Sequence, residues 1–214
     1  RSSSAASASE EKSHARGGTM LQSALMEKPI EGARLHEFFL STTELSFREL
    51  GVGDEAVIGY IAAVLTEFAR SDRLYALRTR RGRAIAGVAD MRRVTKSVSA
   101  DQAQTIRARA VQKYVGDYTL FMTGLFRTHV ESHGALEYYV EEGQRSYRAV
   151  SAFDLTLLRT GYFLFEELAK NFEHYSGALD YMRKAYFTPQ PGQSPFAEFL
   201  RRVEGWVASG LSDN

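Results

Sequence analysis

The sequence predicts an all-α fold, a single-domain bundle of about six or seven helices around a buried central helix. The first observation is that apolar residues recur every three or four positions, while only four prolines interrupt the chain. The second is the stretch 112–126, QKYVGDYTLFMTGLF, which is apolar or small at nearly every position from Tyr114 onward. A helix that is apolar almost all round is a core helix, so we expect the other helices to pack around a helix over 104–133.

Composition narrows the classes of protein. The chain has 214 residues, of which 44% are hydrophobic, enough for one well-buried core. A formal net charge of +1 is far from the strongly basic balance of a nucleic-acid-binding domain, so we expect no nucleic-acid partner. There is no cysteine, which excludes disulfides and thiolate metal sites and is compatible with the cytoplasmic location that we expect. No apolar run reaches about 18 residues, so we expect no transmembrane helix and no membrane partner.

The N-terminal residues 1–28 are expected to form a disordered tail. Residues 1–19 have almost no large apolar side chains, so burial cannot offset the entropy lost on ordering them. One interpretation places the start of translation at Met20, with a tag or upstream read-through before it. The remaining residues 29–210 are predicted to form one helical domain, with a basic loop at 78–98.

In the first half of the domain, a helical pattern begins near Ile30. It either continues to Leu50 or restarts at Ser41, which has a glutamate three residues later as in a capping box. Gly51 ends the pattern in either case. Asp54 then predicts the N-cap of the next helix, whose apolar positions share one helical spacing. These positions are Val57, Ile58, Ile61, Leu65 and Phe68.

In the second half, Ser99 and Gln102 predict the start of the central helix, and Gly134 its end. The next helix spans 135–150. Ser151 and Asp154 predict a further start, after which apolar residues recur with helical spacing, and a kink is expected near Ser176 and Gly177. These recurring residues are Leu155, Leu158, Tyr162, Phe165, Leu168, Ala169 and Phe172. The breaker TPQPG at 188–192 precedes a last helix that starts at Ser194 and Pro195.

Several of these stretches resemble a family of uncharacterised all-helical bacterial proteins. They are GDYTLFMTGLF at 116–126, EYYVEEGQRSY at 137–147, EELAKNF at 166–172 and FLRRVEGWVASG at 199–210. The resemblance runs from about residue 35 to the C-terminus and implies the same helical fold. The family has no assigned activity, so the resemblance implies no catalytic residue.

Asp117 is the most informative single residue, because it lies within the most apolar helix. A carboxylate removed from water needs a charged or hydrogen-bonding partner, or its pKa rises. The candidate partners are Arg145, Tyr147, Arg148 and Tyr162. We favour a buried polar clamp that fixes how the helices register, over a general acid or base or a ligand-recognition group, since no second catalytic group is identifiable.

A second hypothesis is a pocket for a small hydrophobic or aromatic ligand near Asp117. Glycine costs about 1 kcal/mol relative to alanine inside a helix, so such glycines indicate close approach of another helix or of a ligand. Close helix packing is the commoner case. The candidate residues are Gly116, Gly124, Tyr139, Gly143, Tyr147 and Tyr162.

Two further patterns point to other chemistry. His129 and His133 have the i, i+4 spacing of helical zinc sites, although two histidines near a helix C-terminus also interact well with its dipole. A basic patch is typical of a solvated loop, and alternatively of a site for phosphate, RNA or an acidic partner. Its residues are Arg78, Arg80, Arg81, Arg83, Arg92, Arg93 and Lys96.

Three functions follow from these patterns. We favour a helical interaction or regulatory module that is not an enzyme, has no cofactor and binds an unknown protein partner. The alternatives are a binding domain for a small hydrophobic or aromatic ligand, and a metal-dependent enzyme using His129, His133 and a remote carboxylate. The sequence leaves the oligomeric state open.

Overall fold

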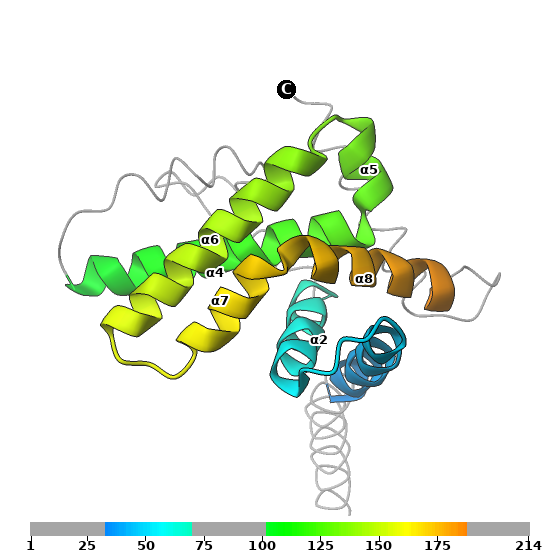
Figure 1. The fold of residues 1–214 in the computed structure, drawn as a ribbon, viewed down its shortest axis with the longest axis horizontal. Coiled ribbons are helices and arrows are strands. Elements are labelled where there is room, and N and C mark those ends of the chain that lie inside the picture. Colours follow the sequence, from blue (N-terminus) through cyan, green and yellow to red (C-terminus); the bar gives the residue numbers. More distant parts are fainter. Residues whose placement is uncertain (1–32, 70–101, 188–214) are drawn as a thin grey trace, which may run out of the picture.

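The structure, a computed structural model, describes residues 33–69 and 102–187. Seven helices and no strands make up this described part, which confirms the predicted all-α bundle (Figure 1). None of the helices in these two ranges is both long and apolar enough to cross a membrane. The first helix covers residues 33–49 and is called the 33–49 helix below. The others are α2 (Glu55–Ala69), α4 (Gln102–Leu125), α5 (Arg127–Ser132), α6 (Leu136–Thr156), α7 (Tyr162–Lys170) and α8 (Phe172–Tyr186).

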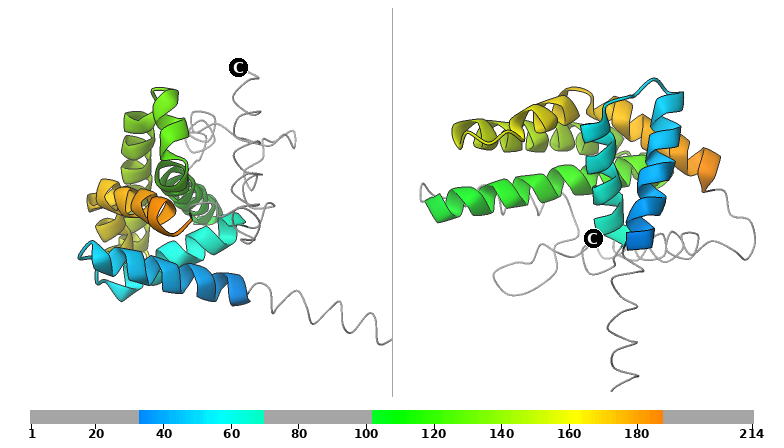
Figure 2. Two further views of the ribbon diagram at one scale, coloured as in Figure 1. Left: turned by 90° about the vertical axis from the view of Figure 1, so that its right-hand side faces the viewer. Right: turned by 90° about the horizontal axis from the view of Figure 1, so that it is seen from below.

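Helix α4 is the centre of the bundle. It packs against α6 along much of its length and against α8 near its C-terminal half, while α6 and α7 form a helical hairpin (Figure 1). The 33–49 helix and α2 lie side by side and cross α4 steeply on another side (Figure 2). The short α5 reverses the direction of the chain after α4, so α6 packs back along α4.

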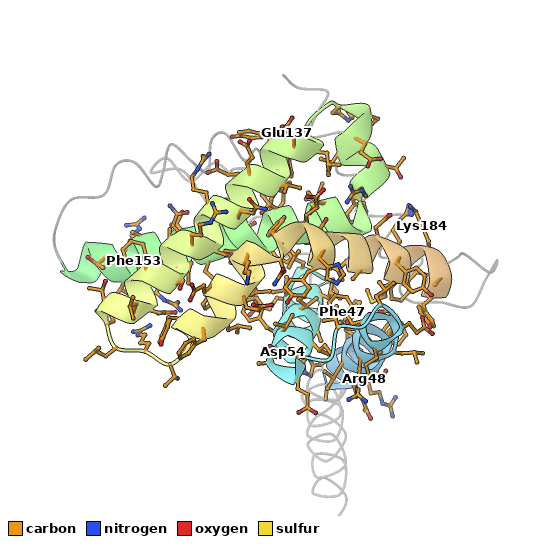
Figure 3. The ribbon with its side chains drawn as sticks, viewed as in Figure 1. Phe47, Arg48, Asp54, Glu137, Phe153 and Lys184 are labelled. Carbon is orange, nitrogen blue, oxygen red and sulfur yellow. The ribbon has the colours of Figure 1, made fainter. Side chains whose placement is uncertain are left out.

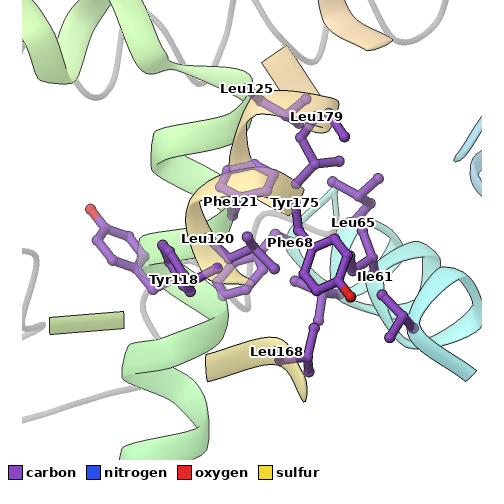
Figure 4. Packing of buried hydrophobic residues seen from close by; sticks show 14 of the residues in the cluster. Ile61, Leu65, Phe68, Tyr118, Leu120, Phe121, Leu125, Leu168, Tyr175 and Leu179 are labelled. Atoms are coloured by element: carbon purple, nitrogen blue, oxygen red, sulfur yellow. The ribbon is translucent and has the colours of Figure 1, made fainter. Parts of the chain in front are cut away.

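The segment around Asp117 is enclosed, as its composition predicts. Every residue from 115 to 126 is buried. Leu120, Phe121 and Leu125 of α4 meet side chains of α2, α7 and α8 in one hydrophobic core (Figure 4). The labelled side chains of these three helices are Ile61, Leu65, Phe68, Leu168, Tyr175 and Leu179. The hydrophobic positions predicted on α2 are all buried.

Helix ends follow the predicted capping chemistry at three places. Asp54 caps α2, because its Oδ1 accepts hydrogen bonds from the backbone amides of Ala56 and Val57 at 2.8 and 3.2 Å. Gly51 and Gly134 have φ of +79° and +62°, the left-handed conformation that ends a helix. At Gly134, the amide donates to the carbonyl of Glu131 and the following amide donates to Val130, the two bonds of a Schellman motif.

The structure contradicts some predicted helix boundaries and, at Ser41, selects one of the two alternatives left open. The predicted central helix 104–133 is two helices, because Phe126 at φ −118° and ψ 29° leaves the helical conformation between α4 and α5. The 33–49 helix runs without a second start at Ser41, whose hydroxyl donates to the carbonyl of Phe38 instead. No helix break accompanies the kink expected near Ser176 and Gly177, since α8 continues through both; the chain breaks earlier, at Asn171.

The predicted helix start at Ser151 and Asp154 is also wrong. Helix α6 continues through both residues to Thr156. The Ser151 hydroxyl donates to the backbone carbonyl of Tyr162 at 2.9 Å, so it ties α6 to α7 rather than capping a helix. The helix is interrupted instead by the turn 157–161. The first position of this turn is neither glycine nor proline, so the sequence does not indicate where the turn begins.

Several predicted features lie outside the described residues. They are the tail 1–28, the basic loop 78–98 with its arginines and Lys96, the cap at Ser99, the breaker 188–192 and the last helix from Ser194.

Candidate functional site

Three charged side chains lie along one face of α4. Arg109, Lys113 and Asp117 are spaced four residues apart, so they share one helical stripe. This stripe faces α2, α6 and α7, which supply its partners. The polar side chains thus enter the core as a continuous line rather than as isolated groups.

Asp117 is the end of the stripe and is only 3% exposed. Its Oδ1 accepts hydrogen bonds from the hydroxyl of Tyr60 on α2 at 2.5 Å and from the hydroxyl of Tyr147 on α6 at 2.9 Å. Its Oδ2 accepts one from Lys113 Nζ at 2.6 Å. We call these four residues the Asp117 network. One carboxylate therefore joins three helices that are distant in sequence.

Burial governs the electrostatics of the Asp117 network. It raises the pKa of the Asp117 carboxyl, and the charge and hydrogen bonds of Lys113 and the two tyrosines lower it only in part. Burial also raises the pKa of Tyr60 and Tyr147 well above the usual value, and the neighbouring charge of Asp117 adds to the effect. Both hydroxyls therefore stay protonated and act as donors over the whole physiological range.

Aromatic rings enclose the Asp117 network. Tyr60 lies edge-on to Tyr147 at 6.4 Å and to Phe165 at 5.3 Å between ring centroids. The Lys113 ammonium lies 4.9 Å from the centroid of the Tyr60 ring, as a cation–π contact. These rings hold both hydroxyls in place, so the hydrogen-bond geometry around the carboxylate is set by the packing of the core.

A second ion pair lies next to the Asp117 network. The guanidinium of Arg109 donates from Nε and Nη2 to the two oxygens of Asp154 on α6, at 2.6 and 2.5 Å. The same guanidinium lies 5.5 Å from the centroid of the Phe165 ring, and Arg159 lies 4.0 Å from Asp154. The two-bond geometry fixes the orientation of α4 relative to α6.

The structure brings together only some of the residues predicted around Asp117. Tyr147 is a partner, as expected. Arg145 pairs instead with Glu142 at 2.6 Å, and Arg148 donates to Gln144 at 3.4 Å. The Tyr162 ring lies against that of Phe163, tilted by 33°, with ring centroids 3.8 Å apart. The prediction of those three partners is therefore wrong, because each side chain finds a nearer neighbour on its own helix.

Sequence reasoning missed Tyr60 and Lys113. The lysine had a signal, since it lies four residues before Asp117 on the same helix. Tyr60 had none that points to Asp117, because the contact joins positions 57 residues apart.

The candidate glycines lie where side chains of neighbouring helices approach closely. A Cβ at Gly116 would lie 2.6 Å from Tyr147 Cε1, and one at Gly124 would lie 2.5 Å from Leu179 Cβ. A Cβ at Gly143 would lie 2.3 Å from Phe172 Cζ. The space at each glycine is occupied by the protein itself, the commoner of the two interpretations given above. Tyr139 is half-buried and packs against Tyr118, with ring centroids 6.5 Å apart.

The two candidate histidines are neighbours. The rings of His129 and His133 have centroids 4.5 Å apart, and His133 Nδ1 lies 2.9 Å from the backbone carbonyl oxygen of His129. Within residues 33–69 and 102–187, no three His, Cys, Asp or Glu side chains gather as a metal site. The described part therefore supplies no third ligand for the histidine pair.

An apolar surface appears at two of the predicted apolar positions, Leu155 and Leu158, and at the nearby Phe163. Leu155, Leu158 and Phe163 are 55%, 92% and 65% exposed. They lie within residues 155–163, which comprise the end of α6, the turn 157–161 and the start of α7, and which we call the α6–α7 tip. The tip lies beyond the labelled Phe153 (Figure 3). The helical spacing of Leu155 and Leu158 indicated burial, but Leu155 lies on an exposed face of the last turn of α6 and Leu158 lies beyond the end of that helix.

Comparison with known proteins gives no assignment. No protein-family model, no curated protein and no solved structure matches this chain. The resemblance to uncharacterised bacterial proteins therefore stays a prediction, and function has to be argued from the geometry alone.

Proposed function

We propose that the protein is a non-catalytic helical interaction module that presents the α6–α7 tip to a partner. Its charged core groups support a structural role. Asp117 receives three donors from three helices, and Asp154 receives both arms of Arg109. Groups bound in this way hold helices in place and are poorly suited to exchange protons with a substrate.

The observation that carries the proposal is the backbone of Leu158. Its φ is +51°, and its amide and the next amide make the same two bonds that end α5 at Gly134. The left-handed conformation costs a non-glycine residue about 1–2 kcal/mol. The side chain is also 92% exposed, so packing within the described fold does not compensate. A leucine that folding disfavours is best explained by a contact outside the fold.

The other two functions are less well supported. The glycine positions that would line a ligand pocket are filled by Tyr147, Leu179 and Phe172. The histidine pair has no third ligand among the described residues. The cytoplasmic location rests on the lack of cysteine, and the bacterial family on the motifs quoted above.

Site-specific photo-crosslinking tests the proposal. Phe163 is replaced by the photoreactive residue benzoylphenylalanine in the full chain, produced in the source organism, and the cells are irradiated. We expect a covalent adduct to a protein, a lipid or a second copy of the chain, because the Phe163 side chain projects into the proposed contact.

The matched control places the same residue at Glu173, an exposed position of α8. An adduct at position 163 that is missing at position 173 supports the proposal. Equal labelling at both positions, or no adduct at 163, contradicts it.

A further inference from the structure

We propose that the α6–α7 tip inserts into the headgroup region of an anionic membrane, so that the protein binds a lipid surface without crossing it. The inference rests on the proposed function and names its partner. It departs from the sequence-based expectation of no membrane partner, which considered spanning helices only. A surface contact requires only a few inserted side chains.

The shape and size of the tip favour a lipid surface over a protein groove. Specific protein interfaces use about 800 Å² and about 20–30 residues on each partner. The α6–α7 tip is much smaller, since it consists of one turn and the two helix ends that flank it, with three exposed apolar side chains. A few leucine and phenylalanine side chains at a protruding turn are well suited to insert about 5–10 Å into the boundary between headgroups and acyl chains.

The charge around the tip is complementary to anionic lipid. Near the tip, Asp154 is buried and paired with Arg109, and the nearest exposed acidic side chain along the chain is Glu166, three residues beyond Phe163. Arg145 is paired with Glu142, so the positive charge available to lipid comes from Arg148 and Arg159. Arg159 is half-exposed beside Leu158, and Arg148 is exposed about 10 Å behind Leu155 along the axis of α6. At the insertion depth given above, these arginines lie at the level of the lipid headgroups.

Vesicle flotation of the full-length protein tests the inference. The probes are vesicles of phosphatidylcholine alone and vesicles that also contain phosphatidylglycerol. We expect binding to the anionic vesicles, weakened by salt, and at least a roughly tenfold loss for Leu158→Ser because the inserted side chain is removed. The matched control is Leu45→Ser, which changes another exposed leucine (52%) on the 33–49 helix and should bind like the parent.

Leu158→Gly separates binding from folding. Glycine adopts φ of +51° without steric cost, so this variant should have a higher melting temperature than the parent. It should nevertheless lose vesicle binding as Leu158→Ser does. A variant that is more stable and binds less cannot be explained by misfolding.

A labelled variant reports insertion directly. The chain has no cysteine, so Leu158→Cys can carry a single environment-sensitive fluorophore, with Glu173→Cys as the control position. We expect a blue shift at position 158 on anionic vesicles and none at position 173. Binding that Leu158→Ser leaves unchanged, or no binding to either vesicle, overturns the inference.

The crosslinking experiment distinguishes the two levels of the proposal. A protein adduct at position 163 without vesicle binding rejects the membrane and keeps the interaction module. No adduct and no vesicle binding reject both.

Discussion

The same chemical motif, one carboxylate held by two tyrosine hydroxyls, occurs in two regions of the molecule. In the core, Asp117 accepts from Tyr60 and Tyr147. At the surface, Glu49 of the 33–49 helix accepts from Tyr181 at 2.9 Å and Tyr186 at 2.7 Å, both on α8. We call the second set the Glu49 fork. The hydrogen bonds are alike, but water can replace the partners of Glu49 and cannot replace those of Asp117.

The comparison teaches that surroundings, not bond count, determine what such a motif contributes. A buried group that loses its partner retains the full cost of desolvation, whereas an exposed group recovers hydrogen bonds from solvent. The Asp117 network should therefore control stability, and the Glu49 fork should contribute little.

The largest expected effect is that of Asp117→Asn. The amide oxygen can still accept from the tyrosines, but the new amino group points at Lys113 and finds no acceptor there. We expect a loss of about 2 kcal/mol in the free energy of unfolding, measured by urea denaturation at neutral pH. Glu49→Gln is the matched control at the surface and should unfold at the parent's urea concentration. Equal midpoints for Asp117→Asn and the parent would remove the distinction between the two regions.

Gly116→Ala is expected to have the next largest effect, because it disturbs the Asp117 network through packing alone. The added methyl would lie 2.6 Å from Tyr147 Cε1, and the fully buried ring has no space to move. Overpacking of this kind costs about 1–3 kcal/mol. Gly177→Ala on α8, where nothing lies within 4 Å, should instead stabilise the protein by about 1 kcal/mol. Thermal unfolding of the two variants checks the opposite signs; shifts of the same sign would refute the argument.

Tyr147→Phe tests a single hydroxyl in each region. It removes one donor from Asp117 while keeping the ring, so we expect a loss of about 1 kcal/mol. Tyr181→Phe makes the same change in the Glu49 fork, where solvent replaces the lost donor, and should leave the urea midpoint unchanged. If both substitutions cost the same, burial does not distinguish the two motifs.

Alkaline titration gives the smallest effect near neutral pH and compares the two motifs directly. The hydrogen bond to Glu49 raises the pKa of Tyr186 to about 12, and burial raises the pKa of Tyr147 well above its usual value. A raised pKa in the folded state means that the unfolded chain loses its protons first. Stability from these tyrosines is therefore complete below pH ~10 and falls as the pH rises above it.

Phenolate absorbance checks the titration. In Glu49→Gln, Tyr186 should ionise at a lower pH while the protein remains folded. Tyr147 should ionise only as the protein unfolds. Ionisation of all 11 tyrosines before unfolding would contradict the assignment.

The sequence predicted the features that depend on local pattern. The burial of 115–126 follows from a helix that is apolar all round, and the cap at Asp54 and the ends at Gly51 and Gly134 follow from local hydrogen bonding and backbone freedom. The close approach at Gly116 also follows from the cost of glycine within a helix.

Features that depend on long-range contact were not predictable in this way. Nothing near Tyr60 indicates that its hydroxyl meets Asp117 on another helix. The exposure of Leu158 was missed because helical spacing alone predicts the same buried face whether or not the helix continues. A leucine in the left-handed conformation gives no signal of a turn, as a glycine would have done.

The Asp117 network also has a consequence for the order of folding events. The Tyr60 hydroxyl lies 57 residues before the Asp117 carboxylate in the sequence. Their contact therefore closes a long loop, and the conformational entropy of that loop is lost before the contact can form. Local helix formation precedes such closures. Substitutions at Tyr60 should therefore speed unfolding and leave the refolding rate nearly unchanged. The Tyr60–Asp117 contact then forms late in folding, so it determines how long the native state persists and has little influence on the folding pathway.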